Sequence, residues 1–551
     1  MSTLPLSAES LALAKLPAVL LRWLALWDQL WQWEAPQQQC SPHWPAAQGS
    51  APDGDGIWLG CASLDDKKIW LAVQDGKVTG GAIGEVHGAR LCALLQRALT
   101  EKAGAVMIIA ESGGVRLQEA NAGLIAVAEC IDAVLRLRAA GIPVLVLIDQ
   151  GRGCFGGMGL IAAAATQVWM TPAARWGMSG AAVIAQAHGN TEFDPEDKAL
   201  HARTHGAWHR SHLHEAMLLP DCEPATLRQQ IATLLAQPVS EAADFFTLPV
   251  LQQRQRALSE RWQTGKSCSD VISYWQSQDV ALPSQWLHEQ PRTAAAAETG
   301  TVQISTLQKR LLAQLSLNDT VQISPQGVVR GQWQSRYRWL VTGTAGGAES
   351  GTSLVLAQAA ACIQALQEPV DAVLLLISTC GQRLRYQEEM LSLHQAMLHL
   401  SACLFALRQA GKPVLGLVCN QAAASAVVTG GMQCDALWAL PEAQIRVMSA
   451  DAIARVTGSD MTADSLRLAQ TAQAHWQTGA VHQLCEAPDR AMLDDWAAEL
   501  QRQQRENTCL PLPDQRSLLG WQRQGRTAAY PVMQALQAAT LHRLVLKPEA
   551  V

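Results

Sequence analysis

The sequence predicts an α/β fold made of two tandem domains that share one design. Short apolar runs with strand character alternate with longer helical patterns, which is typical of parallel strands joined by helical crossovers. The apolar strand at residues 144–148 follows a Gly-Ile-Pro turn, and the strand at 414–418 follows Gly-Lys-Pro. The same order of strand, helix, strand, turn and helix therefore recurs at a spacing of 270 residues, the difference between 144 and 414. A repeat of this length indicates two duplicated domains.

The length of the chain agrees with this duplication. A chain of 551 residues suits two domains of roughly 250 residues, each able to bury its own core. The first 34 residues have a helical, Trp-rich pattern, and the next stretch is rich in Pro, Gln, Ser and Gly. We expect an N-terminal helical segment with a loop, a first domain, a linker and a second domain, at residues 1–56, 57–288, 289–300 and 301–551.

The composition excludes several classes of protein. The apolar fraction of 49% indicates a folded chain, and a net charge of −6 without a Lys/Arg-rich run argues against nucleic-acid binding. The apolar stretch at 16–33 is interrupted by Pro17, Arg22 and Asp28, so it predicts a packing helix and no membrane span. Fourteen cysteines without a C-x-x-C pair predict reduced thiols in the cytoplasm and no zinc site. Because only 16% of the residues are charged, we expect partner subunits, including further copies of this chain as a homo-oligomer, to cover part of the surface.

Two glycine-rich turns in the first domain are the most informative feature of the chain. Residues 111–114 (Glu-Ser-Gly-Gly) follow an apolar strand, and residues 153–157 (Gly-Cys-Phe-Gly-Gly) precede an Ala-rich helix. Glycine lets the backbone approach a ligand closely, and a helix N-terminus presents free N–H groups. Convergent donors from the two turns would form an oxyanion hole, and the alternative is that the glycines serve only tight βα turns. The candidate donors, one from each turn, are Gly113 or Gly114 and Gly156 or Gly157.

The second domain carries an altered copy of this motif. Residues 378–381 (Ser-Thr-Cys-Gly) stand opposite 111–114, and Met448-Ser449-Ala450 stand opposite Met178-Ser179-Gly180. In place of the second glycine turn, this domain has Ala424-Ser425-Ala426. Alanine resists a positive φ and crowds a ligand, so we expect this turn to be inert or to hold only the leaving carboxylate.

Several segments match a known family. Residues 74–86, 112–124 and 153–159 resemble the beta subunit of biotin-independent malonate decarboxylase. The second half resembles the gamma subunit at 379–382, at 385–390 with the following His394-Gln395, and at Gly430-Gly431-Met432. It departs from the gamma pattern at Cys380, where proline is usual, and at Ala424 to Ala426, where Ser-Gly-Gly is usual. The resemblance implies a fused chain of two tandem crotonase-like (carboxyltransferase) domains of the ββα-superhelix type.

The resemblance also implies an activity. In that family a malonyl thioester, carried on the CoA-like prosthetic arm of an acyl carrier protein, loses carbon dioxide and becomes an acetyl thioester. The expected partners are the acyl carrier protein subunit and the acyl-carrier-protein transferase subunit, and no metal, flavin or biotin is expected to be bound tightly. In the second domain the residues expected to contact the substrate are Gly381, Gln421 and Ser425.

Side chains close to the first-domain turns are further candidates for substrate contact. Arg116 is expected to bind the substrate carboxylate or the phosphates of the arm through its fork of donors, and the alternative is a salt bridge with Glu119. Glu119, Cys154 and Phe155 are the other candidates. Glu119 and Cys154 are also alternative proton donors, with a structural role as the competing interpretation.

Histidines gather between residues 188 and 214. Asp194-Pro195 predicts the start of a helix, on which His201, His205 and His209 would share one face at i, i+4 and i+8. No carboxylate or cysteine stands on that face, so we expect no metal there. His209 is the preferred proton donor for the enolate, and solvated surface histidines are the alternative.

Three other functions remain open at this point. A biotin-dependent carboxyltransferase acting on an acyl-CoA would share the fold, but it would need an intact second turn. An enoyl-CoA hydratase would need two carboxylates near the turns, for which Glu111 and Glu119 are the candidates. The third alternative is that the chain is not an enzyme but a scaffold that docks the carrier protein and the transferase.

Overall fold

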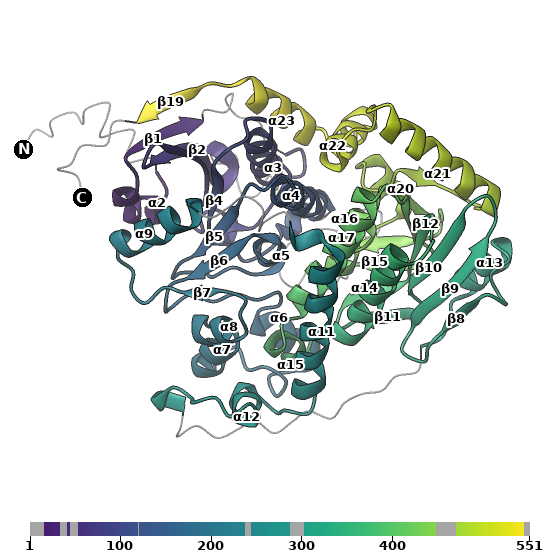
Figure 1. The fold of residues 1–551 in the computed structure, drawn as a ribbon, viewed down its shortest axis with the longest axis horizontal. Coiled ribbons are helices and arrows are strands. Elements are labelled where there is room, and N and C mark those ends of the chain that lie inside the picture. The colour runs from purple at the N-terminus through teal and green to yellow at the C-terminus, as the bar shows by residue number, and fades with distance from the viewer. Residues whose placement is uncertain are drawn as a thin grey trace, which may run out of the picture.

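The computed structural model describes residues 16–33, 41–44, 53–119, 121–236, 244–286, 302–447 and 470–544. Two large sheets lie side by side, the first half on the left and the second half on the right of Figure 1, with helices packed between them. Within these residues, no helix combines the length and the apolar character that crossing a membrane requires. The expected linker at 289–300 and the segment at 448–450 lie outside the described residues.

The first sheet has eight strands in the order β19-β1-β2-β3-β4-β5-β6-β7. From β3 to β7 neighbouring strands are parallel, and β19, β1, β2 and β3 pair antiparallel. Parallel strands need crossovers, and helices α3, α4 and α5 lead from β3 to β4, from β4 to β5 and from β5 to β6. The strands are β1 (Gln29–Trp33), β2 (Ile57–Leu64), β3 (Lys67–Gln74), β4 (Ala105–Ala110), β5 (Val144–Ile148), β6 (Gln167–Met170), β7 (Met217–Leu218) and β19 (Leu541–Leu544).

The second sheet repeats this plan with seven strands in the order β18-β16-β14-β12-β10-β9-β8. Its parallel part runs from β10 to β18, and α14, α16 and α17 stand where the first half has α3, α4 and α5. The strands are β8 (Val321–Ile323), β9 (Val328–Gln334), β10 (Arg338–Thr344), β12 (Ala372–Ile377), β14 (Val414–Val418), β16 (Ala436–Ala439) and β18 (Gln483–Leu484). The short pairs are β11 (Gly347–Ser350) with β13 (Thr379–Gln382), and β15 (Gln421–Ala423) with β17 (Gln444–Arg446).

The helices complete both units. Those of the first half are α2 (Ala18–Arg22), α3 (Glu85–Thr100), α4 (Asn121–Ala139), α5 (Gly156–Ala164), α6 (Ala181–His188), α7 (Lys198–His205), α8 (Ala207–His212), α9 (Pro224–Leu235), α11 (Leu248–Gly265) and α12 (Val271–Ser277). Those of the second half are α13 (Thr306–Gln314), α14 (Thr352–Gln367), α15 (Tyr386–Met390), α16 (Leu393–Gln409), α17 (Ala424–Thr429), α20 (Ala472–Gln477), α21 (Arg490–Arg505), α22 (Leu512–Gln522) and α23 (Ala529–Ala538). The alternation of strands and helices that the sequence predicted is therefore present in both halves.

The two ends of the described chain meet in one sheet, which the sequence did not predict. Residues 16–33 were expected to form one helix, but only Ala18–Arg22 is α-helical and β1 follows. The alternating Gln-Leu-Trp-Gln-Trp pattern has the period of a strand, and Trp33 packs against Trp70 with ring centroids 5.2 Å apart. Leu30 of β1 pairs with Leu544 of β19, so β19 belongs to the first sheet and α23 packs on α3. The yellow segment that runs along the top of Figure 1 is this return to the first half.

Buried charges join the two halves through α4. Asp132 accepts a hydrogen bond from Arg408 of α16 at 2.9 Å and forms a 2.7 Å ion pair with Arg136. Glu129, one turn earlier, holds Arg526 through both carboxylate oxygens at 2.6 Å, and both side chains are fully buried. Paired charges of this kind tolerate burial because each has a partner of opposite sign. The first and second units consequently share one continuous core.

Candidate active site

The two glycine turns of the first half meet at the carboxyl ends of β4 and β5. Gly114 has a φ of 127° and Gly156 a φ of 55°, values that favour glycine. A Cβ added to Gly156 would lie 2.7 Å from the Gly114 Cα, so the two backbones are in direct contact. Bridges from Ser112 to Cys154 and from Cys154 to Trp176 hold the turns in register. The structure therefore places the two predicted turns together.

The four predicted N–H donors differ in what they already bind. The Gly113 N–H donates to the Gly80 carbonyl, and the Gly156 N–H donates to the Met178 carbonyl, both at 2.9 Å. The Gly114 N–H has a longer bond of 3.2 Å to the Ser112 hydroxyl. Gly157 stands in the first turn of α5, and no described residue accepts its N–H. Among these four N–H groups, Gly157 is thus the one without a described acceptor, and Gly114 has the longest of the three bonds.

The second half keeps the backbone of these turns but crowds it with side chains. Gly381 has a φ of 119°, close to that of Gly114, and its N–H bonds the Thr379 hydroxyl at 3.1 Å as Gly114 bonds Ser112. Ala424 has a φ of 51° and stands where the first half has Gly156. A Cβ on Gly381 would lie 3.3 Å from the Ala423 Cβ.

The other candidates of the second half bind neighbouring side chains. The Ser425 hydroxyl donates to Gln382 Oε1 at 2.9 Å. Gln421 lies beside Gly347, and its Oε1 accepts a 3.3 Å bond from Arg446. The structure therefore gives Gln421 and Ser425 internal partners next to the turn.

A pocket of about 540 Å³ opens beside the first turn. Gly80, Gly113 and Val115 form part of its wall, and Arg152 and Arg175 add two guanidinium groups. Its size is in the range of small-molecule sites. Sequence reasoning missed both arginines. Arg152 stands inside the glycine-rich turn, which was a usable signal, whereas Arg175 is brought in by the chain after β6 and carries no local pattern.

Arg116 forms part of the wall of this pocket, but its guanidinium is already paired with buried carboxylates of the protein. The side chain is 1% exposed and pairs with Asp55 at 2.9 Å and with Glu119 at 2.6 Å. Glu119 also accepts the Glu85 N–H at 2.6 Å, at the start of α3. The salt bridge between Arg116 and Glu119, which was the alternative interpretation, is therefore present, and substrate binding by these two residues stays a prediction.

Cys154 and Phe155 lead into α5. Cys154 is fully buried, and burial raises the pKa of its thiol, so a role in proton transfer is not supported. Phe155 is half-buried at the N-cap of α5, with its ring edge-on to His205 at 5.1 Å. A Cβ on Gly157 would clash with Val127 of α4. Gly157 is therefore required by the packing of α5 on α4 in addition to any contact with a substrate.

The histidine segment is helical, but the helix does not start at Asp194-Pro195 as predicted. The helical run begins at Lys198 with Asp197 as its cap and breaks at Gly206, and no described group of His, Cys, Asp and Glu is arranged to hold a metal. His209 is fully buried away from the pocket. Its Nε2 donates to the Met390 carbonyl and its Nδ1 accepts from Trp275, both at 2.9 Å.

Burial also lowers the pKa of His209 well below its ordinary value. A neutral ring with both nitrogens occupied has no proton to give to a substrate. These contacts favour a structural role for His209 over its predicted role as the proton donor.

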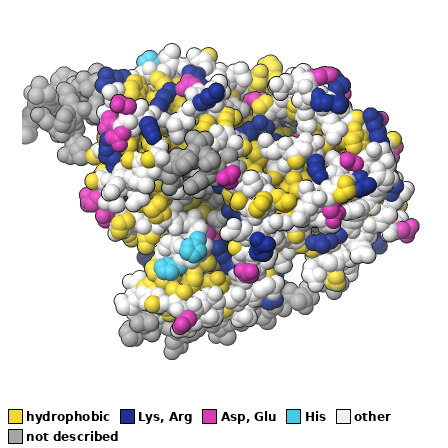
Figure 2. Space-filling model, in the orientation of Figure 1, with side chains coloured by type: hydrophobic (Ala, Val, Ile, Leu, Met, Phe, Trp, Pro, Cys, Tyr) yellow, Lys and Arg dark blue, Asp and Glu magenta, His cyan; other side chains and the backbone are white. Residues whose placement is uncertain are grey.

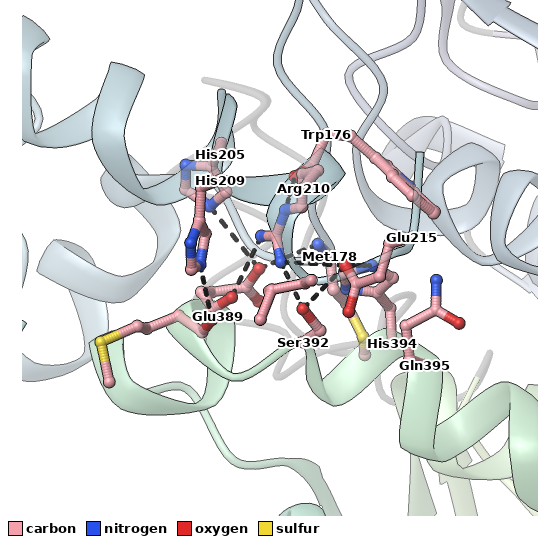
Figure 3. A network of polar contacts seen from close by, with 12 residues as sticks. Trp176, Met178, His205, His209, Arg210, Glu215, Glu389, Ser392, His394 and Gln395 are labelled. Atoms are coloured by element: carbon pink, nitrogen blue, oxygen red, sulfur yellow. Dashed lines mark hydrogen bonds and ion pairs between the residues drawn. The ribbon is translucent and has the colours of Figure 1, made fainter. Parts of the chain in front are cut away.

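A polar network at the junction of the halves surrounds this histidine (Figure 3). Glu389 of α15 accepts the backbone N–H groups of Met178 and Ser179, and His205 lies 3.6 Å from it. Arg210 donates to the carbonyls of Trp176 and Glu389, both at 3.0 Å. Sequence reasoning did not select Glu389 or Arg210, because their partners are about 200 and about 30 to 180 residues away.

Comparison with known proteins identifies both halves. A carboxyl transferase domain model matches residues 46–217, and a malonate decarboxylase gamma subunit model matches residues 345–540. The chain is 36% identical over 219 residues to a malonyl-S-ACP:biotin-protein carboxyltransferase of Malonomonas rubra. This alignment covers 37% of this chain and 69% of the relative. It is 33% identical over 141 residues to an acetyl-coenzyme A carboxylase carboxyl transferase subunit beta of Fusobacterium nucleatum, over 25% of this chain and 45% of the relative.

A solved structure gives a third comparison. A chain of a Pseudomonas malonate decarboxylase hetero-tetramer in complex with malonate is 31% identical, with 40% of this chain and 82% of that chain covered and a TM-score of 0.38. The sequence matches are therefore partial in length, but they fall on both halves. The alignment covers more than two thirds of the Malonomonas relative, and the two domain models match one half of the chain each. The chain therefore belongs to the malonate decarboxylase family of carboxyltransferase-fold proteins.

Proposed function

We propose that this chain decarboxylates a malonyl thioester carried on an acyl carrier protein and releases carbon dioxide and the acetyl thioester. The observation that carries the proposal is the contact between Gly114 and Gly156, beside a pocket whose lining includes Arg152 and Arg175. The printed names of the relatives support the substrate class, since one acts on malonyl-S-ACP and another was solved with malonate.

The chemistry needs a place for negative charge. When the bond between the carboxylate carbon and the methylene carbon breaks, its electron pair moves toward the thioester carbonyl, which becomes an enolate oxygen. The Gly114 and Gly157 N–H groups are the donors we assign to that oxygen. Losing one such donor typically costs about 3 kcal/mol of transition-state stabilisation. The enolate carbon then takes a proton, and the acetyl thioester is complete.

The arginines of the pocket suit an anionic substrate. Arg152 is exposed at the pocket, and Arg175 donates to the Gly151 carbonyl at 3.0 Å, which fixes one side of its guanidinium. Guanidinium groups bind phosphate and carboxylate oxygens with paired hydrogen bonds. We assign them to the phosphates of the CoA-like arm, on the carrier side of the thioester.

The proposal includes the working context of the chain. An acyl carrier protein subunit would deliver the substrate, and an acyl-carrier-protein transferase subunit would load it, with no tightly bound cofactor. The thirteen described cysteines are all unpaired, which suits the reducing cytoplasm. On the face shown in Figure 2, Lys and Arg side chains are dispersed among acidic and uncharged ones.

Carboxyl transfer to biotin is the second candidate, because the Malonomonas relative is named for it. That reaction would use a second acceptor site in the other half. Ala424 places a methyl group where the first half has the bare Gly156, which favours simple decarboxylation.

One experiment separates these activities. The purified chain is incubated with malonyl-CoA, or with malonyl carrier protein, labelled in the free carboxylate, with and without added biotin. Decarboxylation gives labelled carbon dioxide at the same rate in both reactions. Label recovered in carboxybiotin would establish transfer instead, and absence of both products with either carrier would leave the scaffold as the function.

A further inference from the structure

We infer that Glu389, which belongs to the second half, is a positioning residue for the second glycine turn of the first half. Its Oε1 accepts the Ser179 N–H at 2.7 Å, and its Oε2 accepts the Met178 N–H at 3.0 Å. The side chain is 2% exposed, and Figure 3 shows it between α15 and the segment that carries Met178. Charge-assisted bonds of this kind are about twice as strong as neutral ones.

The segment held by Glu389 is in direct contact with the turn. Met178 accepts the Gly156 N–H through its carbonyl at 2.9 Å, while its own N–H is bound by Glu389. The next contact along, from the Gly177 N–H to the Cys154 carbonyl, is 3.2 Å long. A single peptide layer therefore separates the Glu389 carboxylate from the start of α5, and the position of Gly156 follows the position of Met178.

Arg210 fixes the same layer from its other end. Its Nε donates to the Trp176 carbonyl, and its Nη2 donates to the Glu389 carbonyl, both at 3.0 Å. The guanidinium is fully buried and also contacts Ser392. Together, Glu389 and Arg210 hold the Trp176 carbonyl and the N–H groups of Met178 and Ser179, so little freedom is left to this segment.

The repeat shows where Glu389 stands relative to its counterpart in the first half. Glu388 accepts the Thr352 N–H at 3.0 Å at the start of α14, as Glu119 accepts the Glu85 N–H at the start of α3. These two glutamates are therefore counterparts in the repeat. The residue after Glu119 is Ala120, which has no carboxylate, whereas the residue after Glu388 is Glu389. Through Glu389, the second half thus supports the turn of the first half.

This inference rests on the proposed function for its catalytic consequence. A displacement of about 1 Å at a reacting group can cost on the order of a hundredfold in rate. The Gly157 N–H follows Gly156 in the chain, so a shift of Met178 moves the proposed oxyanion donor. Neither Glu389 nor Met178 lines the pocket that contains Arg152, so we expect substrate binding to change less than turnover.

The test compares two buried carboxylates of the junction. Glu389→Gln keeps the shape but offers one acceptor and an NH₂ group where two N–H donors need oxygens. We expect kcat for carbon dioxide release from malonyl-CoA to fall 10- to 100-fold and KM to stay within threefold. Amide hydrogen exchange at residues 154–160 and 176–180 should accelerate at least tenfold. Asp132→Asn, which removes a charge from the same junction without touching these residues, should keep kcat within twofold.

Each result decides the matter. If Glu389→Gln keeps kcat within twofold, or leaves exchange at 154–160 unchanged, the positioning role is overturned. An equal loss of kcat in both variants would show that general weakening of the junction is the cause, which also overturns it. If the unmodified protein releases no carbon dioxide, the proposed function fails, and the exchange measurement alone still decides whether Glu389 holds the turn.

Discussion

Ala424 keeps the left-handed backbone of its counterpart Gly156, with a φ of 51° against 55°. The turn of the second half has therefore kept its backbone conformation but lacks the glycine that adopts a positive φ without steric strain. Alanine in this conformation costs roughly 1–2 kcal/mol. The two positions give a matched pair of opposite substitutions, and their effects separate catalysis from stability.

Gly156→Ala should remove at least 99% of carbon dioxide release. The new Cβ would lie 2.7 Å from the Gly114 Cα and would force the two turns apart. Steady-state assays with malonyl-CoA measure the loss. Gly180→Ala is the control, because nothing lies within 4 Å of its added Cβ, and it should retain nearly full activity. Full activity in Gly156→Ala would show that the turn contact has no part in catalysis.

Ala424→Gly should raise the free energy of unfolding by about 1 kcal/mol, because glycine adopts a positive φ without steric strain. Urea unfolding, with the slope held common to both proteins, measures the change. Decarboxylation should stay within twofold of the unmodified protein. A fall in stability would mean that the methyl group makes packing contacts worth more than the strain.

Ser425→Ala should have less than a tenfold effect on kcat, equivalent to about 1.4 kcal/mol. The Ser425 hydroxyl is bound to Gln382, so its removal disturbs a bond inside the second half and leaves the first turn intact. The variant is assayed beside Gly156→Ala. If the serine change alone abolished turnover, the catalytic turn would be that of the second half.

Arg116 and Arg152 should respond differently to alanine. Arg116→Ala leaves Asp55 and Glu119 buried without their partner, which should cost about 3–5 kcal/mol of stability in urea unfolding. Arg152→Ala should leave stability unchanged and raise KM for malonyl-CoA about tenfold, with kcat within twofold. Arg336, which is 60% exposed on the turn between β9 and β10, supplies a surface control. A stable Arg116→Ala protein with a raised KM would support its predicted role in binding.

The junction should weaken in acid through Asp132. Burial acts to raise the pKa of this carboxyl, but Arg136 and Arg408 outweigh it and lower the pKa from 3.8 to about 2. A group whose pKa is lowered by folding adds stability above its unfolded pKa and loses it as the pH falls through the folded one. Its contribution of about 2 kcal/mol should therefore disappear between about pH 4 and pH 2. Urea unfolding across that range should show a slope that Asp132→Asn reduces.

The parts of this protein that could be predicted are those with a local signal. The apolar strands, the G-x-P turns and the duplicated glycine motif identified two α/β units and brought Gly114 and Gly156 together. Distant partners were not predictable. Leu30 pairs with Leu544 across the whole chain, and His209 owes its two hydrogen bonds to Trp275 and Met390. No pattern within a window of sequence encodes such contacts, so the strand β19 and the structural role of His209 were missed.

The choice between paired candidates also needed coordinates. Sequence placed Gly113 beside Gly114 and Gly156 beside Gly157 without distinguishing them. Hydrogen bonding separates them, because Gly113 and Gly156 already donate to Gly80 and Met178. The alternative interpretation correctly paired Arg116 with Glu119, whereas its other charged partner, Asp55, lies 61 residues away in the sequence.

The pairing of β1 with β19 has a consequence for how the protein is made. During synthesis on the ribosome, the first half emerges long before Leu541–Leu544, so the free edge of β1 stays exposed while the second half is translated. A nascent chain in this condition offers unpaired N–H and C=O groups to any other strand for many seconds. Completion of the first sheet thus has to wait until the second half has been made.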